Sequence, residues 1–435
     1  YREILPGLPY NLPPLEAKIS LLFADIAKIV TALSDGVEQK GTKTISKWLL
    51  DSVMGISGNA AHEISHRAGI DGKKLVASLS IHEVQGIAKV LTDLAQHLRE
   101  NRFEPGLYRG LKAHDVIDFW VFPMYSIKSP REIFATANDA INAYFERKNQ
   151  AIALKAAVNG ITKQLNKHLK KLRQNLFFTD QKLIKTAEMD KYKLWGEILS
   201  ANLYRIEPGL DKVSLPNFYD GDKHILIPLK IKLSPSQNAQ IYFKQYKKLQ
   251  ATELIVKKRR ENHLMEVDYL ENVLVSLENS ETLEEVYEIR REVEAQGYIK
   301  TSNRRSSPVS KSEPLSFKST DGFNIFVGKN NRQNDLLTLK RSKPEDIWVH
   351  TKNIPGSHVI IESQGATVSE KALQEACTLA AYFSKAQNSS NVPVDYTLIK
   401  HVKKPAGTKP GFVNYTHQKT MYVTPDKSIL ERLSL

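Results

Sequence analysis

The sequence predicts a multidomain α+β protein with a helix-hairpin-helix-like helical body, a long antiparallel coiled-coil arm and a C-terminal α+β domain. Three observations support this fold class. The chain has 435 residues, which is enough for several hydrophobic cores. Apolar residues recur every three or four positions along two long central stretches. After residue 314, short apolar runs typical of strands alternate with polar loops and one helical segment near residues 369–386.

The N-terminal part of the chain combines a helical region with one strand-like run. Residues 31–104 are predicted to be a helix-hairpin-helix-like domain, with the hairpin turn at residues 54–64. Gly55 and Gly58 would let this tight turn approach a phosphate, and the next helix would offer free N–H groups. A helical corner without any ligand is an equally good interpretation.

The two segments that flank this helical region are expected to belong together in another domain. Residues 1–30 begin with a proline-rich stretch, which excludes one regular element. Residues 105–130 include the strand-like run 116–122, which is too short to be a domain of its own. The chain begins with Tyr1 rather than methionine, so we expect a fragment truncated at its N-terminus, in which a signal peptide cannot be read.

Residues 131–300 are predicted to form the coiled-coil domain. Helices are expected at about residues 130–178 and 236–278, because apolar side chains step by three or four within both. A small β tip is expected between them, at residues 213–233. A hairpin within the chain is the simpler arrangement, although the seams would also allow pairing between two chains.

The charge of the chain favours polyanionic partners. The formal net charge is +14, which attracts nucleic acid or an anionic membrane surface. Between residues 147 and 185 only Asp180 opposes the lysines and arginines. A solvated helix face normally mixes both signs, so this stretch favours RNA contact over the solvated-face interpretation. The predicted contacts of the arm are Lys163, Lys167, Lys170, Lys171, Arg173, Lys257, Lys258, Arg259 and Arg260.

The C-terminal region contains the strongest candidate site. Residues 301–314 are Ser-rich and basic, which predicts a linker, and residues 315–435 form the last domain. Three strand-end loops in this domain combine glycines, amides and cations, and this combination suits phosphate. Phe412 and Tyr415 interleave with the cations, as in proteins that bind single-stranded RNA. The predicted RNA-binding residues are Lys329, Asn330, Asn331, Arg332, His350, Lys352, Gly356, Ser357, His358, Lys400, His401, Lys403, Lys404 and Lys409.

No catalytic site is predicted. Ser357 and His358 are adjacent on a strand and would point to opposite faces, with no acid placed beside them. His350, His358 and His401 could converge on a metal, but no cysteine or carboxylate joins them and strand histidines are usually structural. There is no Walker-type glycine loop and no dinucleotide fingerprint. The sequence therefore predicts a protein that is not an enzyme and uses no metal or cofactor.

Cysteine content and hydropathy favour a cytoplasmic protein. Cys377 is the only cysteine, which fits a reducing compartment, and a small core residue is its expected role. No apolar run approaches the ~18 residues that a membrane span needs. We therefore expect no membrane partner.

Three motifs in the C-terminal domain resemble the RNA-binding domain of the NFACT family: DIWVHTKNIPGSHV, VGKNNRQND and IKHVKKPAGTKPGFV. The resemblance covers nearly the whole chain in order. It implies that residues 1–30 and 105–130 are the remnant of an NFACT N-terminal domain, that residues 131–300 are the middle domain, and that residues 315–435 are the RNA-binding domain. The Asp-Arg pair that family members use near tRNA would lie in the missing part, so no residue is assigned to it.

The resemblance implies a role in ribosome-associated quality control. The partners would be the rRNA of a large ribosomal subunit obstructed by peptidyl-tRNA, and alanyl-tRNA, recruited for C-terminal alanine tailing. Peptide-bond formation would belong to the ribosome. Older names in the family instead imply a surface adhesin that binds fibronectin or fibrinogen at the cell surface. A purely structural scaffold would leave the loops at Gly328, Gly356 and Gly411 unexplained.

Overall fold

The computed structural model describes residues 18–22, 26–38, 42–110, 115–300 and 312–433. The chain divides into two compact units, residues 1–155 and residues 156–435. The predicted proline-rich stretch and most of the predicted linker at residues 301–314 lie outside the described residues.

Four α-helices form the body of the N-terminal unit. The last of them starts with a capping box, in which Ser80 and Glu83 exchange hydrogen bonds through their side chains and backbone N–H groups. Ile29 of the first helix is buried in one core with Leu91 of the last, so the first helix crosses the domain boundary predicted at residue 30. The helices are α1 (Ile26–Glu38), α2 (Ile45–Ser52), α3 (Gly58–Arg67) and α4 (Ile81–Arg99).

A three-stranded antiparallel sheet follows these helices, in the order β2-β1-β3. Its strands are β1 (Gly106–Arg109), β2 (Val116–Trp120) and β3 (Arg131–Ile133). β2 lies within the strand-like run 116–122. Leu107 of β1 pairs with Glu132 of β3, so residues 131–133 belong to this sheet and the start predicted for the coiled coil is too early.

Glu63 of α3 joins the helices to the loop between β2 and β3. Its buried carboxylate accepts the backbone N–H groups of Tyr125 at 3.0 Å and Ser126 at 2.8 Å, and it binds Arg67 at 2.7 Å. Burial acts to raise the pKa of Glu63, but the hydrogen bonds from Arg67 and Ser126 outweigh burial and hold the pKa below its ordinary value. The carboxylate therefore stabilises the unit in its charged form.

We predict that Glu63→Gln lowers the free energy of unfolding by about 1–3 kcal/mol at neutral pH. The reason is that Arg67 loses the buried carboxylate with which it forms an ion pair. In the wild type, the stability that this carboxylate contributes is present above the ordinary pKa of 4.5 and is lost as pH falls through the lowered folded pKa. Urea unfolding between about pH 2 and pH 7 measures both effects. Asp93→Asn on the exposed face of α4 is the control, and an unchanged pH dependence in Glu63→Gln would contradict the prediction.

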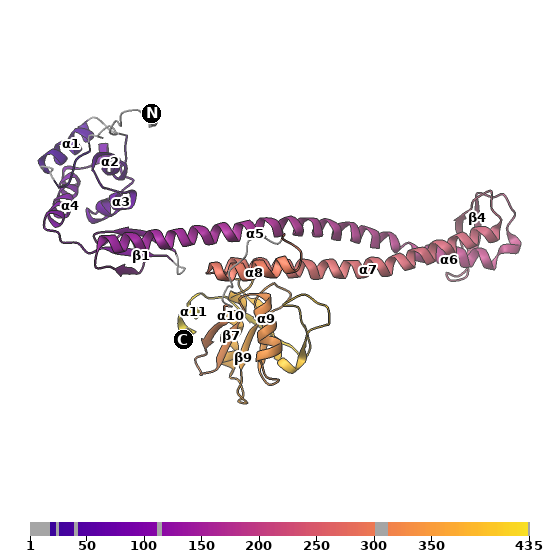
Figure 1. The fold of residues 1–435 in the computed structure, drawn as a ribbon. Helices are drawn as coiled ribbons and strands as arrows, with labels where there is room; N and C mark the ends of the chain where they lie inside the picture. Colours follow the sequence, from indigo (N-terminus) through magenta and orange to yellow (C-terminus); the bar gives the residue numbers. More distant parts are fainter. Residues whose placement is uncertain (1–17, 23–25, 39–41, 111–114, 301–311, 434–435) are drawn as a thin grey trace, which may run out of the picture. The chain divides into compact units, whose positions relative to one another are not determined.

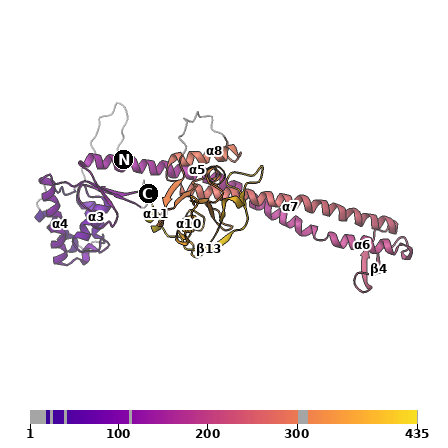
Figure 2. The ribbon, with the colours of Figure 1, turned by 90° about the horizontal axis from the view of Figure 1, so that it is seen from below.

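Two long antiparallel helices, α5 (Ala137–Thr186) and α7 (Pro235–Asn279), form the coiled-coil arm. They lie side by side in both ribbon views (Figures 1 and 2). Arg173 binds Glu271 and Asp180 binds Arg260, each at 2.7 Å, so the partner's number falls as α5 advances. The seams thus pair within the described chain. α5 begins and ends later than the predicted 130–178, and α7 agrees with the predicted 236–278 to within one residue at each end.

Helix caps and a small core complete the arm. Ser234 and Gln237 form a capping box that starts α7, and Thr282 and Glu285 form another that starts α8 (Leu283–Ala295). The far end carries α6 (Met189–Ala201) and a hairpin of β4 (Lys212–Asn217) and β5 (Lys223–Pro228). Trp195 of α6 is buried there among side chains of the hairpin, which lies where the sequence predicts a β tip.

The C-terminal domain is built on an antiparallel sheet in the order β13-β10-β8-β9-β7-β6. One face buries Val349 and Val394 against α10 (Glu370–Tyr382) and α11 (Ser428–Leu433). On the other face, Trp348 packs against Leu337 and Val402. The strands are β6 (Leu315–Lys318), β7 (Asn324–Val327), β8 (Ile347–Thr351), β9 (Val359–Glu362), β10 (Val392–Leu398), β11 (Val402–Lys403), β12 (Asn414–Tyr415) and β13 (Lys419–Val423).

The prediction of a single helix in this domain is wrong. In addition to α10, the domain contains α11 and α9 (Asn331–Leu336), which runs into a π-helical turn at Leu337–Arg341. α9 occupies residues that were expected to be a loop, because the Asn330 side chain caps it by accepting the N–H of Gln333 at 2.9 Å. Cys377 is buried in α10, and burial raises the pKa of its thiol to about 12, as befits a core residue.

Candidate nucleic-acid interface

The structure brings together the three strand-end loops that the sequence singles out. The backbone N–H of Gly328 donates to the carbonyl of His358, whose own N–H donates to Oδ1 of Asn334, both at 3.1 Å. The N–H of Gly411 donates to Oδ1 of Asp335 at 3.1 Å. The loops after β7, before β9 and after β11 therefore form one continuous surface.

Part of this surface faces protein rather than solvent. Three carboxylates of α8 hold the segment that opens α9. Lys329 binds Glu285 at 2.7 Å, and the side-chain amides of Asn330 and Asn331 donate to Glu288 at 3.1 Å and to Glu292 at 3.0 Å, respectively. We call these three pairs the α8 contact. Asn330 and Asn331 are buried and Lys329 is ion-paired, so all three hold this segment against α8, and their predicted contact with RNA stays a prediction.

Glu292 is the most buried carboxylate of the α8 contact, with 1% of its surface exposed. Its Oε1 accepts both the hydroxyl of Tyr269 at 2.9 Å and the amide of Asn331 at 3.0 Å. Burial raises the pKa of Glu292 despite these bonds and the nearby charge of Arg332. Arg332 itself is exposed in the first turn of α9.

α7 supplies a second set of contacts to the same loops. The N–H of Gly356 donates to Oδ1 of Asn272 at 2.8 Å, and Lys385 binds Glu271 at 2.9 Å. Ser357 is also buried, and its N–H donates to the carbonyl of Phe383 at 3.1 Å. Gly356 and Ser357 therefore position the loop, and their predicted contact with RNA stays a prediction.

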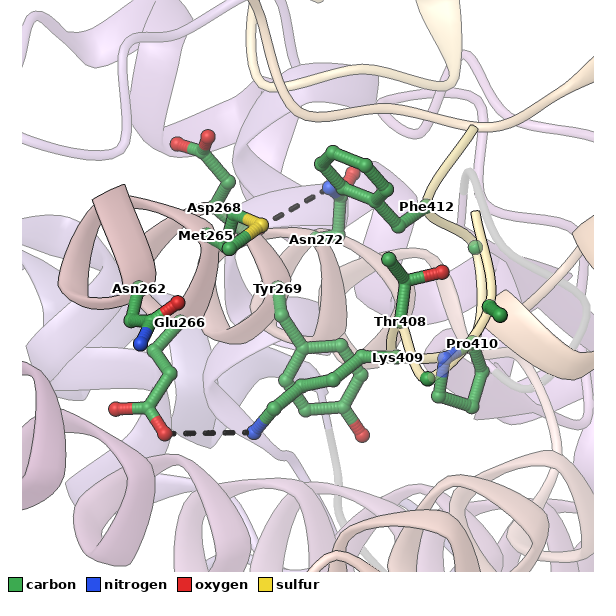
Figure 3. A pocket seen from close by; sticks show the side chains of 13 residues that line it. Asn262, Met265, Glu266, Asp268, Tyr269, Asn272, Thr408, Lys409, Pro410 and Phe412 are labelled. Carbon is green, nitrogen blue, oxygen red and sulfur yellow. Dashed lines mark hydrogen bonds and ion pairs between the residues drawn. The ribbon is translucent and has the colours of Figure 1, made fainter. Parts of the chain in front are cut away.

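Lys404 and Lys409 are engaged within the protein. Lys404 forms an ion pair with Asp335. The ammonium of Lys409 lies 4.9 Å from the ring centre of Tyr269 and 3.8 Å from Glu266 (Figure 3). It also lies 4.2 Å from the ring centre of Tyr298. Burial lowers the pKa of Lys409, although Glu266 acts in the opposite direction. Both lysines thus stabilise the fold of the loop.

The two strand histidines form an aromatic cluster with Trp348. The rings of His350 and His358 meet edge to face at 5.5 Å, and Nδ1 of His358 shares a hydrogen bond of 2.8 Å with Oγ1 of Thr338. Burial holds the pKa of His358 well below its ordinary value and lowers that of His350. His401 stacks elsewhere, on His417. Within the described residues, no group of three His, Cys, Asp or Glu side chains is arranged to hold a metal ion.

An exposed surface, which we call the basic ribbon, remains on the outer side of β11 and β12. His401 and His417 stack at 4.3 Å between their ring centres, and β11 pairs with β12 through Lys403 and Asn414. Lys352 is also exposed, 3.9 Å from Asp395. Sequence reasoning did not select His417, which the β11–β12 hairpin returns beside His401. Lys419, also outside the predicted set, is the exposed first residue of β13. The residues of this basic ribbon are Lys400, His401, Lys403, His417 and Lys419.

The predicted arm contacts divide into paired and unpaired cations. Arg173 and Arg260 bridge the two helices, and Lys257 binds Glu253 at 2.7 Å. The other six are exposed, and no salt bridge to them occurs among the residues that the structure describes; they are Lys163, Lys167, Lys170, Lys171, Lys258 and Arg259.

The predicted hairpin turn has an open geometry. Gly55 has φ +80°, and Gly58 is the first residue of α3, after the N-cap Ser57. A Cβ atom at either glycine would meet nothing within 4 Å, so neither is required by close packing. The contact of this hairpin turn with a phosphate stays a prediction.

The described molecule thus has the features of a multidomain nucleic-acid-binding protein: an arm and a C-terminal domain that both expose unpaired cations. Residues 1–312 match the NFACT N-terminal and middle domains, and residues 314–416 match the NFACT protein RNA binding domain. The chain belongs to the NFACT family.

Curated relatives and a solved structure agree with this membership. "Rqc2 homolog RqcH" of Bacillus subtilis (strain 168) is 36% identical over 445 residues, which cover 100% of this chain and 73% of that protein. The protein of the same name from Streptococcus suis (strain 05ZYH33) is 32% identical over 437 residues, which cover 100% of this chain and 72% of that protein. The solved C-terminal part of the fibronectin/fibrinogen-binding protein from Streptococcus suis aligns with a TM-score of 0.53 and 34% identity, over 65% of this chain and 99% of that one.

Among the described residues, no helix combines the length and hydropathy that a membrane crossing requires.

We predict that Glu292→Gln changes the pH dependence of stability. Because the folded pKa of Glu292 is raised, the wild type loses stability as pH rises from the ordinary value of 4.5 through the raised one. Glutamine keeps the accepting Oε1 without the charge, so unfolding in urea should cost roughly 1–4 kcal/mol more for the variant at neutral pH, with the difference vanishing near pH 4.5. Glu284→Gln, exposed on the same helix, is the control. A variant less stable than wild type at neutral pH would refute this.

Proposed function

We propose that this protein acts in the cytoplasm in ribosome-associated quality control. It binds a large ribosomal subunit that is obstructed by peptidyl-tRNA, and it recruits alanyl-tRNA so that the stalled chain receives a C-terminal alanine tail. The observation that carries this proposal is the exposed basic ribbon on a domain of the NFACT RNA-binding type. Two full-length matches to proteins named "Rqc2 homolog RqcH" support the ribosomal setting.

Recognition is divided between two surfaces of the second unit. The basic ribbon contacts RNA through exposed Lys400 and Lys403, whose charges no described carboxylate neutralises. The arm contacts RNA through its exposed lysines, such as Lys167 and Lys171. α7 has 45 residues and is therefore about 68 Å long, so the arm reaches RNA far from the ribbon.

The protein recognises and positions RNA, and peptide-bond formation belongs to the ribosome. Buried members of the predicted site, such as Asn330 and Ser357, hold the loops in place through hydrogen bonds within the protein. A basic surface can also bind an acidic glycoprotein. Fibronectin therefore enters the experiment as a competitor, because the solved Streptococcus suis relative is named for binding it.

We predict that the double variant Lys400→Glu with Lys403→Glu weakens binding to purified large ribosomal subunits. Two lost phosphate contacts should lower the slope of log K against log salt by about 2, and affinity should fall by roughly ten-fold or more. Binding is measured by sedimentation or fluorescence anisotropy across a salt series, in parallel with fibronectin.

The matched control is Lys371→Glu with Lys427→Glu. It makes the same change of charge on exposed residues beside α10 and α11, on the opposite face of the sheet. If both double variants lose the same affinity for the subunit, the loss reflects net charge and not a contact at the basic ribbon. Saturable fibronectin binding without any preference for ribosomes would overturn the proposal.

The arm gives a separate prediction. Lys167→Glu with Lys171→Glu, one turn apart on the exposed face of α5, should also weaken subunit binding and reduce the salt slope by about 2. The control change Lys244→Glu with Lys248→Glu alters charge on exposed residues one turn apart on α7, outside both the predicted set and the stretch 147–185. Unchanged binding in the first variant would remove the arm from the interface while leaving the ribbon assignment in place.

A further inference from the structure

A cavity of about 260 Å³ lies between α7 and the strand-end loops of the C-terminal domain. Its aromatic lining comes from Trp348, Phe412 and Tyr415, and α7 contributes Asp268 and Asn272. The volume falls just below the roughly 300–1,000 Å³ of sites for drug-sized ligands. It therefore suits one flat ring system rather than a folded element.

Trp348 carries an unsatisfied donor in the lining of this cavity. Its side chain is 1% exposed, and its indole N–H donates to no partner among the described residues. Buried N–H groups normally have a partner, so this one stands out. The indole ring itself is held firmly, with its centre 4.7 Å from that of Tyr415 and 5.6 Å from that of His350, which lies parallel to it.

The charges around the cavity favour a base inside it and phosphate groups outside it. Asp268 is the one acidic side chain in its lining, and a carboxylate repels phosphate but accepts N–H donors such as those of a base. Tyr415 of the cavity wall belongs to β12, which pairs with β11 next to Lys403. The same hairpin thus presents aromatic surface inward and the cations of the basic ribbon outward. Lys352 is exposed beside Asn353, at another edge of the cavity.

We propose that this cavity binds one unstacked nucleobase of the RNA whose phosphates lie along the basic ribbon. This inference rests on the proposed function and adds the chemical class of ligand at its C-terminal site. The base stacks on a partly exposed aromatic side chain, for which we choose Phe412 because it stands at the junction of two cavities, and an acceptor atom of the base accepts the indole N–H of Trp348. Binding is noncovalent and no bond of the RNA changes.

The cavity also explains why an aromatic residue stands in the Gly411 loop. Phe412 lines both this cavity and an adjoining one of about 410 Å³, which lies along α7 between Asn262 and Asn272 (Figure 3). The packing around Gly411 is tight, because a Cβ atom there would come within 2.4 Å of Oδ1 of Asn331. The loop is therefore fixed in front of the α8 contact, and Phe412 is presented at the junction of the two cavities.

The first test is direct observation of the Trp348 indole signal by NMR in the ¹⁵N-labelled full chain. The chain has four tryptophans, so the Trp348 signal is assigned by its loss in Trp348→Phe. The ligands are the four nucleoside 5′-monophosphates and ribose 5-phosphate. We expect at least one nucleoside monophosphate to shift the Trp348 signal in a saturable way, and ribose 5-phosphate to leave it in place. No shift with any nucleotide, or an equal shift with ribose 5-phosphate, would overturn the inference.

The second test measures affinity for a short single-stranded RNA. Phe412→Ala should weaken binding by about ten-fold with an unchanged salt slope, because stacking rather than phosphate contact is lost. Tyr422→Ala, which removes an exposed aromatic side chain from β13, is the matched control. If the change at Lys400 and Lys403 abolishes RNA binding while Phe412→Ala has no effect, the proposal of a base site is refuted and the proposed function stands. If the lysine changes leave RNA and subunit binding intact, the proposed function fails.

Discussion

The arrangement of the C-terminal domain depends on the α8 contact, in which Glu285, Glu288 and Glu292 hold Lys329, Asn330 and Asn331. A carboxylate buried this deeply is unfavourable unless several donors satisfy it. Glu292 meets this requirement through Tyr269 of α7 and Asn331 of α9, so one side chain ties three helices together. The backbone N–H and the charge of Arg332, in the first turn of α9, also favour the charged form of Glu292. The loop at Gly411 packs on this contact, and the cavity follows from it.

Ion pairs with α7, α8 and α9 decide which cations of the C-terminal domain stay available. The chain has 48 acidic residues against 62 lysines and arginines, so many cations lack an ionic partner. Carboxylates of α7, α8 and α9 pair with four lysines of this domain: Lys329, Lys385, Lys404 and Lys409. Lys400 and Lys403, on the outer side of the hairpin, are left to solvent. The interface is therefore defined as much by where acidic residues are absent as by where lysines gather.

The sequence predicts the arm well and the site only in part. Periodicity locates α7 to within one residue at each end, because a seam of apolar side chains leaves a local signal. The partners of Lys329 and Asn331 leave none, since Glu285 and Glu292 lie about forty residues earlier in the chain. A cluster of cations and amides gives the same sequence pattern whether its partner is a phosphate of RNA or a carboxylate of the protein. His417 was missed for a similar reason: only the β11–β12 pairing returns it to His401.

α7 belongs to the arm and also lines the cavity that we propose as a nucleobase site. Leu270 and Val273 of α7 are buried, while Asp268 and Asn272 of the same turns line the cavity. A ligand in the cavity touches both α7 and the C-terminal domain, so it binds the docked arrangement and stabilises it by mass action. By linkage, whatever favours that arrangement also favours the ligand. Under the proposed mode of binding, an RNA contact of the arm that favours this arrangement would therefore also favour insertion of a base beside Trp348.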